Sequence, residues 1–137
     1  MKEKLNCILL VDDDSATNFL HKRIIERTNC TEDIKTFQTA QEALDYLTGK
    51  KNGKNPKPDL IFLDINMPGL NGWDFLEAYL ALPKGQIGNI IIVMLTTSMN
   101  PDDRTRARQY PIQGYRNKPL TNEMLEEILK ANFPEKF

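Results

Sequence analysis

The segment from Pro58 to Gly72, PDLIFLDINMPGLNG, places a charged side chain at the end of an apolar element. Residues 60–63 are four apolar residues between a Pro-Asp pair and a cluster of turn-forming residues, which is typical of a short buried strand. The strand ends at Asp64. A carboxylate in this position either simply begins the next loop or needs a cation, hydrogen bonds or a reaction to offset its burial. The rest of the chain must decide between these interpretations.

Four further segments predict strands, and helical patterns separate all five. The strand segments are 5–11, 34–37, 60–63, 90–95 and 114–117. Near-continuous apolar runs such as IIIVML are typical of strands that are covered on both faces of a parallel sheet. The alternation predicts an α/β fold, a doubly wound five-stranded parallel sheet of (βα)5 type with strand order 2-1-3-4-5. The length of 137 residues excludes a closed eight-unit barrel.

The helix after the first strand is predicted to begin at Asp14 or Ser15, because either side chain can cap a helix. Its apolar residues are expected to face the core. They are Phe19, Leu20, Ile24 and Ile25. His21 lies among charged residues and is interpreted as a solvated surface side chain, neither a ligand nor a base.

The later helices differ in their apolar content. Residues Ala40, Ala43, Leu44 and Leu47 recur with helical spacing, and Thr121 is expected to cap a last helix that buries Met124, Leu125, Ile128 and Leu129. A helix over 73–82 is expected to bury Leu76, Tyr79 and Leu80 and to be broken by Pro83 and Gly85. The segment 101–109, PDDRTRARQ, has almost no apolar face beyond Ala107 and the following Tyr110. We therefore expect this helix to be marginal.

The loop from Thr48 to Lys57, TGKKNGKNPK, contains four lysines and resembles a phosphate-binding loop in composition. It leads into the third strand, so it is expected at the amino-terminal edge of the sheet, away from Asp64. A solvated connector is the better interpretation of these lysines.

Composition limits the class of protein. The 18 Lys and Arg residues nearly balance the 19 Asp and Glu residues, so there is no general electrostatic reason to bind nucleic acid or an anionic membrane. Cys7 and Cys30 make neither a disulfide pattern nor a metal pattern. The apolar stretch near the N-terminus is too short for a signal peptide. We expect a cytoplasmic protein with a single domain over residues 1–137.

Polar side chains follow the predicted strands at the edge where their carboxyl ends meet. Asp12 and Asp13 follow the first strand, Asp64 the third, Thr96 the fourth and Lys118 the fifth. Carboxylates about 4 Å apart repel each other by roughly 4 kcal/mol at an effective dielectric constant of 20, so the cluster needs a proton or a cation. Hard oxygen ligands in a small open site suit Mg²⁺.

These residue types favour phosphoryl chemistry. An aspartate beside Mg²⁺ and a lysine can attack phosphorus and form an aspartyl phosphate, which assigns Asp64 as the nucleophile. Lys118 can offset charge on the transferring group, and Thr96 can donate a hydrogen bond to another phosphoryl oxygen.

The motifs VDDDS at 11–15, LDINMPGLNG at 63–72, MLTTS at 94–98 and GYRNKPL at 114–120 closely resemble the receiver domain of two-component response regulators, the CheY-like family. The resemblance covers about residues 5–132. It implies that Asp64 accepts a phosphoryl group from a phosphohistidine on a kinase or a phosphotransfer protein. It further implies an Mg²⁺ site made by Asp12, Asp13, Asp64 and the backbone carbonyl of Asn66, and a switch pair made by Thr96 and Tyr115.

The resemblance also implies a signalling module rather than an enzyme with its own substrate. No output domain is expected in 1–137, so the signal would pass through the face made by the helix at 101–109, the strand at 114–117 and the last helix. An unidentified protein target would recognise that face. The chain itself would be a monomer or a phosphorylation-dependent homodimer. Thr97 departs from the family, which more often has a smaller residue there, and this bears on the rate of dephosphorylation.

Two alternatives from other classes remain at this point. An Mg²⁺-dependent phosphohydrolase with an aspartate nucleophile would want a second acid two residues after it, where this chain has Asn66. A degenerate receiver would bind partners without phosphorylation, although every reacting residue is present here.

Overall fold

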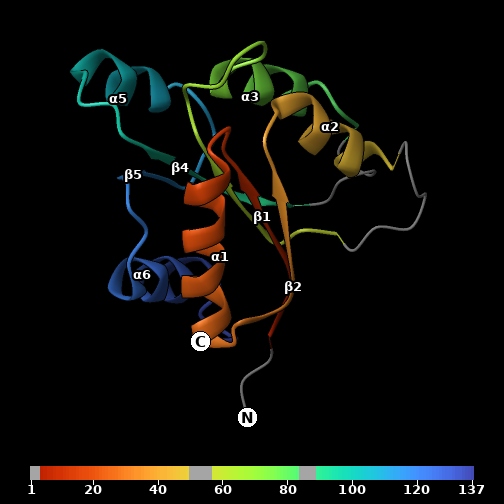
Figure 1. The fold of residues 1–137 in the computed structure, drawn as a ribbon, viewed down its shortest axis with the longest axis vertical. Helices are drawn as coiled ribbons and strands as arrows, with labels where there is room; N and C mark the ends of the chain where they lie inside the picture. The colour runs from red at the N-terminus through yellow and green to blue at the C-terminus, as the bar shows by residue number, and fades with distance from the viewer. Residues whose placement is uncertain (1–3, 50–56, 84–88) are drawn as a thin grey trace.

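A computed structural model describes residues 4–49, 57–83 and 89–137. Five parallel strands form one sheet in the order β2-β1-β3-β4-β5, which confirms the predicted fold class (Figure 1). The strands are β1 (Leu5–Val11), β2 (Thr31–Phe37), β3 (Leu60–Leu63), β4 (Ile91–Thr96) and β5 (Gly114–Asn117). The helices are α1 (Ser15–Thr28), α2 (Ala40–Thr48), α3 (Gly72–Leu80), α5 (Pro101–Ala107) and α6 (Asn122–Asn132).

Successive residues of the central strands point to opposite faces of the sheet, and each face has its own core. Cys7, Leu9 and Val11 of β1 pack on the side of α2, α3 and α5. Leu5, Ile8 and Leu10 pack on the side of α1 and α6. Burial on both faces explains why the sequence of β1 is almost continuously apolar.

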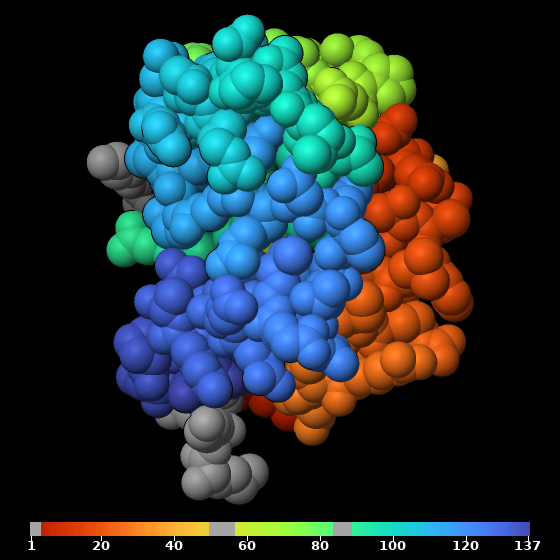
Figure 2. Space-filling model, turned by 90° about the vertical axis from the view of Figure 1, so that its left-hand side faces the viewer, coloured from red at the N-terminus to blue at the C-terminus, as the bar shows by residue number. Residues whose placement is uncertain are grey.

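The ribbon and the surface give the same arrangement of helices. Figure 1 has α2, α3 and α5 along the top of the view and α6 beside the lower end of α1. Figure 2, turned by 90°, presents α5, the β5 segment and α6 as one continuous face. Among the described residues, no helix has the length and apolar character needed to span a bilayer.

Two helices begin at the residues that the sequence predicts. Asp14 is the N-cap of α1 and accepts a hydrogen bond from the Ala16 N–H, and Thr121 caps α6 by accepting from the Met124 N–H. Leu125, Ile128 and Leu129 are buried, as expected for α6. The predicted connector at 48–57 and the break at Gly85 lie largely outside the described residues.

The prediction for the buried face of α1 was confirmed for Ile25 but wrong for Phe19 and Leu20, and the interpretation of His21 as a solvated side chain was also wrong. Phe19 and Leu20 are 58% and 60% exposed, whereas Asn18, His21 and Ile25 face the sheet. The side-chain N–H of Asn18 donates to the backbone oxygen of Asp12, and His21 accepts a backbone N–H from Leu120. Backbone groups beyond the strand ends need polar partners, so α1 presents two polar residues to the interior.

Two smaller expectations also needed correction. The second strand begins at Thr31 rather than Ile34, because its first residues pair with β1 from Leu5 onward. In α3, Leu76 is buried but Leu80 is 46% exposed. The helix leaves Leu80 on the solvent side at its last turn.

Candidate functional site: an acidic pocket at the carboxyl edge of the sheet

The register of the sheet brings the first and third strand ends together. Val11 is paired with Leu63, so the residues that follow them, Asp12 and Asp64, leave the sheet side by side. The backbone N–H of Asp64 donates to the Val11 oxygen at 3.0 Å. The acids therefore lie at the point where the strand order reverses, the usual place for a ligand in an open α/β sheet.

Three carboxylates gather at this point. Asp12, Asp13 and Asp64 each offer an oxygen, and these oxygens all lie within 4.8 Å of one another. Asp12 and Asp64 are each 5% exposed, while Asp13 faces solvent. The cluster thus has a buried floor and an open rim.

Lys118 reaches the same pocket from the end of β5. Its ammonium nitrogen Nζ lies 2.5 Å from Oδ2 of Asp12 and 3.4 Å from Oδ1 of Asp64. The Lys118 side chain is 12% exposed. One largely buried cation therefore faces two buried carboxylates.

The electrostatics of the pocket perturb two of these groups. Burial raises the pKa of Asp64 to about 6, with Lys118 opposing the increase and Asp12 adding to it. Burial alone would lower the pKa of Lys118, but its contacts with Asp12 and Asp64 outweigh that effect and raise it. Lys118 is therefore positively charged at neutral pH, and the ionised form of Asp64 is held at a cost.

Thr96 completes the edge from β4. Its side chain is fully buried, and its Oγ1 accepts a hydrogen bond from the Ser98 N–H at 3.0 Å. The backbone oxygen of Thr96 accepts from the Lys118 N–H at 2.8 Å, which ties the ends of β4 and β5 together. Because the hydroxyl oxygen of Thr96 acts as an acceptor, its proton is left to donate to another group.

Tyr115 lies on β5 with its ring packed at the edge of the core under α5. Its hydroxyl oxygen is buried and has no hydrogen-bond partner among the described residues. The guanidinium of Arg104, from α5, lies over the ring, 4.9 Å from its centroid. A buried hydroxyl without a partner is costly, so the position of Tyr115 depends on the packing around it.

The turn after Asp64 depends on two glycines. The sequence pattern indicated a turn here but not why glycine is needed. Gly69 has a φ of +73°, in the left-handed region that glycine favours. A Cβ on Gly72 would lie 2.5 Å from the Asp64 backbone oxygen. Only a hydrogen atom fits there, so α3 begins directly against the backbone that carries Asp64. Asn66 lies in this turn with its side chain exposed, and the ligand role of its carbonyl stays a prediction.

The donor set fits a hard divalent cation. Carboxylate oxygens from Asp12, Asp13 and Asp64 converge at the pocket with one acid open to solvent. Mg²⁺ prefers a few carboxylates and keeps several water ligands, which suits such an open rim. These three acids would hold the ion, and the ion would supply positive charge to a bound phosphoryl oxygen.

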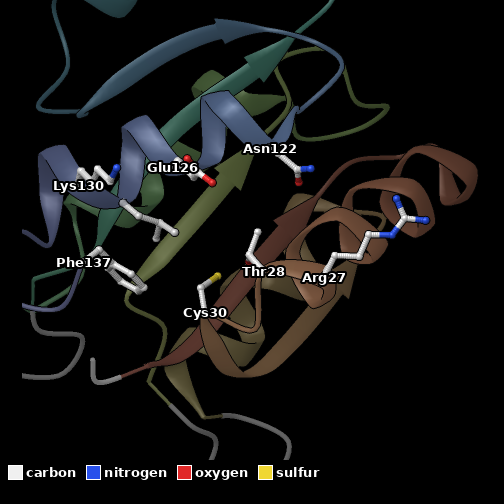
Figure 3. A pocket seen from close by; sticks show the side chains of 8 residues that line it. Arg27, Thr28, Cys30, Asn122, Glu126, Lys130 and Phe137 are labelled. Carbon is white, nitrogen blue, oxygen red and sulfur yellow. The ribbon is translucent and has the colours of Figure 1, made fainter. Parts of the chain in front are cut away.

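A second hollow of about 470 Å³ lies away from the acids, between α1 and α6 (Figure 3). Arg27, Thr28, Glu126 and Lys130 line it beside Cys30. Burial raises the pKa of the Cys30 thiol, so this cysteine is protonated at neutral pH and unsuited to nucleophilic attack. The paired acids and the buried lysine thus single out the carboxyl edge as the chemical site.

Comparison with known proteins agrees with this geometry. The family model of the response regulator receiver domain matches residues 8–130. The probable methanogenesis regulatory protein FilR2 of Methanothrix harundinacea is 32% identical over 123 residues, which is 90% of this chain and 78% of that protein. Chemotaxis protein CheY-3 of Vibrio cholerae is 32% identical over 126 residues, which is 92% of this chain and 90% of that protein.

The fold matches solved structures of the same kind. A two-component response regulator from Cytophaga hutchinsonii superposes with a TM-score of 0.84 at 30% identity, covering 97% of this chain and all of that one. The matched region contains the whole acidic pocket, from β1 to the residues that follow β5. The chain therefore belongs to the response regulator receiver domain family.

Proposed function

We propose that Asp64 of this receiver accepts a phosphoryl group from a phosphohistidine on a sensor kinase or a histidine phosphotransfer protein. The observation that carries the proposal is the position of the Lys118 ammonium between Asp12 and Asp64, 2.5 Å and 3.4 Å away. In the transfer, an Asp64 oxygen forms a bond to phosphorus while the bond from phosphorus to the donor imidazole nitrogen breaks. The leaving imidazole takes up a proton.

The neighbouring residues have separate roles in this proposal. Asp12, Asp13, Asp64 and the backbone carbonyl of Asn66 would hold Mg²⁺, which would supply positive charge to the transferring group. Once the Asp64 carboxylate is esterified, the Lys118 ammonium pairs with a phosphoryl oxygen instead of with Asp64. The Thr96 hydroxyl donates a second hydrogen bond to a phosphoryl oxygen.

The surface beside the pocket suits a protein donor. A groove of about 700 Å³ beside α1 is lined by Phe19, Leu20 and Ile24 of that helix and by Thr97 and Lys118. The exposed apolar pair Phe19 and Leu20 gives a docking protein apolar area to bury beside Asp64. A phosphohistidine on a docked helix would then face the open rim of the pocket.

The signal leaves the molecule through a change of surface. In the proposal, Thr96 is drawn toward the phosphoryl oxygen, Tyr115 moves in response, and the face of α5, β5 and α6 takes a new shape. A protein target or a second copy of the chain reads that face. Among the described residues the Tyr115 hydroxyl has no hydrogen-bond partner, which supports this step, because a different position can give that hydroxyl a hydrogen bond.

We also propose that the protein works in the cytoplasm. Cys7 and Cys30 are both buried and form no disulfide, and we infer a reducing compartment such as the cytoplasm.

Phosphotransfer profiling tests the donor. The purified chain is mixed with ³²P-labelled histidine kinases and phosphotransfer proteins from the source cell, with Mg²⁺, and the label is followed over seconds to minutes. We expect rapid label transfer from one or a few of them to the chain. Steady release of phosphate from small phosphate esters, without label transfer, would favour a phosphohydrolase. Failure of every donor would favour a degenerate receiver.

A further inference from the structure

His21 is buried directly behind the acidic pocket. The imidazole is 3% exposed, and it is the only histidine of the chain. It lines a cavity of about 10 Å³ together with Asp12, Asn18 and Asp64. It also lines the groove that contains Lys118. None of the roles proposed above uses this side chain.

The hydrogen bond of His21 reaches the segment that carries Lys118. Nε2 accepts the backbone N–H of Leu120 at 3.3 Å, across 99 positions of sequence. Pro119 has no N–H, and the N–H of Lys118 donates to the Thr96 oxygen. The backbone on either side of Pro119 is therefore fixed by two contacts, one to β4 and one to α1.

His21 is suited to accept rather than donate at Nε2. Burial lowers its pKa, with Asp12 opposing the change, and this keeps the imidazole neutral. A neutral imidazole that accepts at Nε2 carries its proton at Nδ1. The imidazole thus gives the Leu120 N–H an acceptor that an apolar side chain cannot provide.

We propose that His21 is a positioning residue for phosphoryl transfer, which holds the 118–120 segment so that the Lys118 ammonium meets the phosphoryl group on Asp64. This inference rests on the proposed function of Asp64 and Lys118. His21 then affects the rate of phosphoryl transfer only through the position of Lys118. Metal binding by the acids stays unchanged.

Imidazole NMR tests the contact in the unmodified protein. The single histidine gives a single set of ring ¹⁵N signals, so no assignment by mutation is needed. We expect an unprotonated Nε2 and a protonated Nδ1 at neutral pH, with a hydrogen-bond coupling or a contact to the Leu120 amide. A ring protonated at Nε2 would overturn the proposal, because it cannot accept from Leu120.

Phosphorylation kinetics test the function. With a small phosphoramidate donor and saturating Mg²⁺, His21→Leu should be phosphorylated more slowly by on the order of tenfold, because Leu120 loses its acceptor. His21→Gln should recover most of the rate, because its amide oxygen can replace Nε2. Both variants should bind Mg²⁺ as the wild type does. Ile25→Val, a buried change on the same helix face, is the matched control and should keep the wild-type rate.

A double-mutant cycle separates positioning from general loss of stability. If His21 acts through Lys118, His21→Leu should slow the reaction no further when Lys118 is already alanine. Two results would overturn the proposal in a wild type that still becomes phosphorylated. One is that His21→Leu slows the Lys118→Ala variant by the same factor as it slows the wild type. The other is that His21→Leu alone reacts at the wild-type rate. A wild type that takes no phosphoryl group from any donor would instead refute the proposed function, and the positioning role with it.

Discussion

Asp64 combines burial with a negative charge, and the residues around it explain how both are tolerated. Asp64 is 5% exposed and lies beside Asp12, so its ionised form is destabilised. Lys118 offsets part of this effect from 3.4 Å. A carboxylate that is poorly stabilised in the resting protein gains from an incoming cation, because the cation reduces the charge repulsion.

The raised pKa of Asp64 predicts a pH effect on stability in metal-free buffer. The pKa of about 6 in the folded protein lies above the usual 3.8, so the folded state binds this proton more tightly than the unfolded chain. The stabilisation from Asp64 is therefore full below pH 3.8 and is lost as the pH rises through about 6. We expect the melting temperature of Asp64→Asn, relative to wild type, to rise from about pH 4 to about pH 7. A difference that stays constant or falls would contradict the raised pKa.

Thr97 predicts a slow loss of the phosphoryl group. The residue is exposed and lines the same groove as Lys118, and we expect its side chain to hinder the approach of water to the phosphoryl group. Thr97→Ala should lose phosphate several-fold faster, measured as decay of label after the donor is removed. Thr105→Ala, an exposed change on α5, is the control and should decay as the wild type does. An equal or slower decay in Thr97→Ala would reject this role.

At the scale of elements, α5 is held by a few specific contacts rather than by an apolar face. Ala107 is its only buried residue. Arg104 lies over the Tyr115 ring, and Arg106 lies over the Trp73 ring, 4.7 Å from its centroid. Tyr110, just after the helix, stacks on Trp73 at 5.6 Å. Few buried contacts imply a low free energy of local opening, so a small change at the pocket can repack α5.

This attachment makes Trp73, the single tryptophan, a native reporter of α5. We expect beryllofluoride with Mg²⁺ to change the Trp73 fluorescence and to change amide hydrogen exchange in residues 98–117. Arg104→Ala should shift the resting protein toward the activated exchange pattern, whereas Arg108→Ala, at the end of the helix, should not. Exchange changes confined to 48–57, with 98–117 unchanged, would contradict the proposed output.

The helices differ in how well their buried faces could be predicted from the sequence. Apolar spacing identified the buried faces of α2 and α6 because those helices only cover the sheet. It failed for part of α1, where Asn18 and His21 are buried in place of Phe19 and Leu20 and bond to backbone groups of Asp12 and Leu120. Such partners come from distant segments, so no periodicity in α1 can indicate them. Polar residues at strand ends predicted the pocket because parallel strands share one carboxyl edge.

At the scale of the whole molecule, metal binding and folding are linked. The three acids converge only in the folded chain, because they follow β1 and β3. A ligand that binds only the folded state stabilises it by RT ln(1 + [L]/Kd), or about 2.7 kcal/mol at a hundredfold excess over Kd. We therefore expect Mg²⁺ to raise the melting temperature.

Two variants make the Mg²⁺ measurement specific. Asp13→Ala should reduce the increase in melting temperature, because it removes one acid of the cluster. Asp14→Ala removes the N-cap of α1 and should lower the melting temperature itself, yet it should keep the full increase with Mg²⁺. A melting temperature that does not respond to Mg²⁺ would show that the acids do not form a metal site.

Site mapping of the labelled chain shows whether one carboxylate, Asp64, receives the phosphoryl group. The chain is incubated with a phosphodonor and Mg²⁺, the acyl phosphate is trapped by borohydride reduction, and the modified residue is identified by mass spectrometry. We expect modification at Asp64 alone and no label on Asp64→Asn. Label on Asp12 or Asp13, or wild-type labelling of Asp64→Asn, would contradict it.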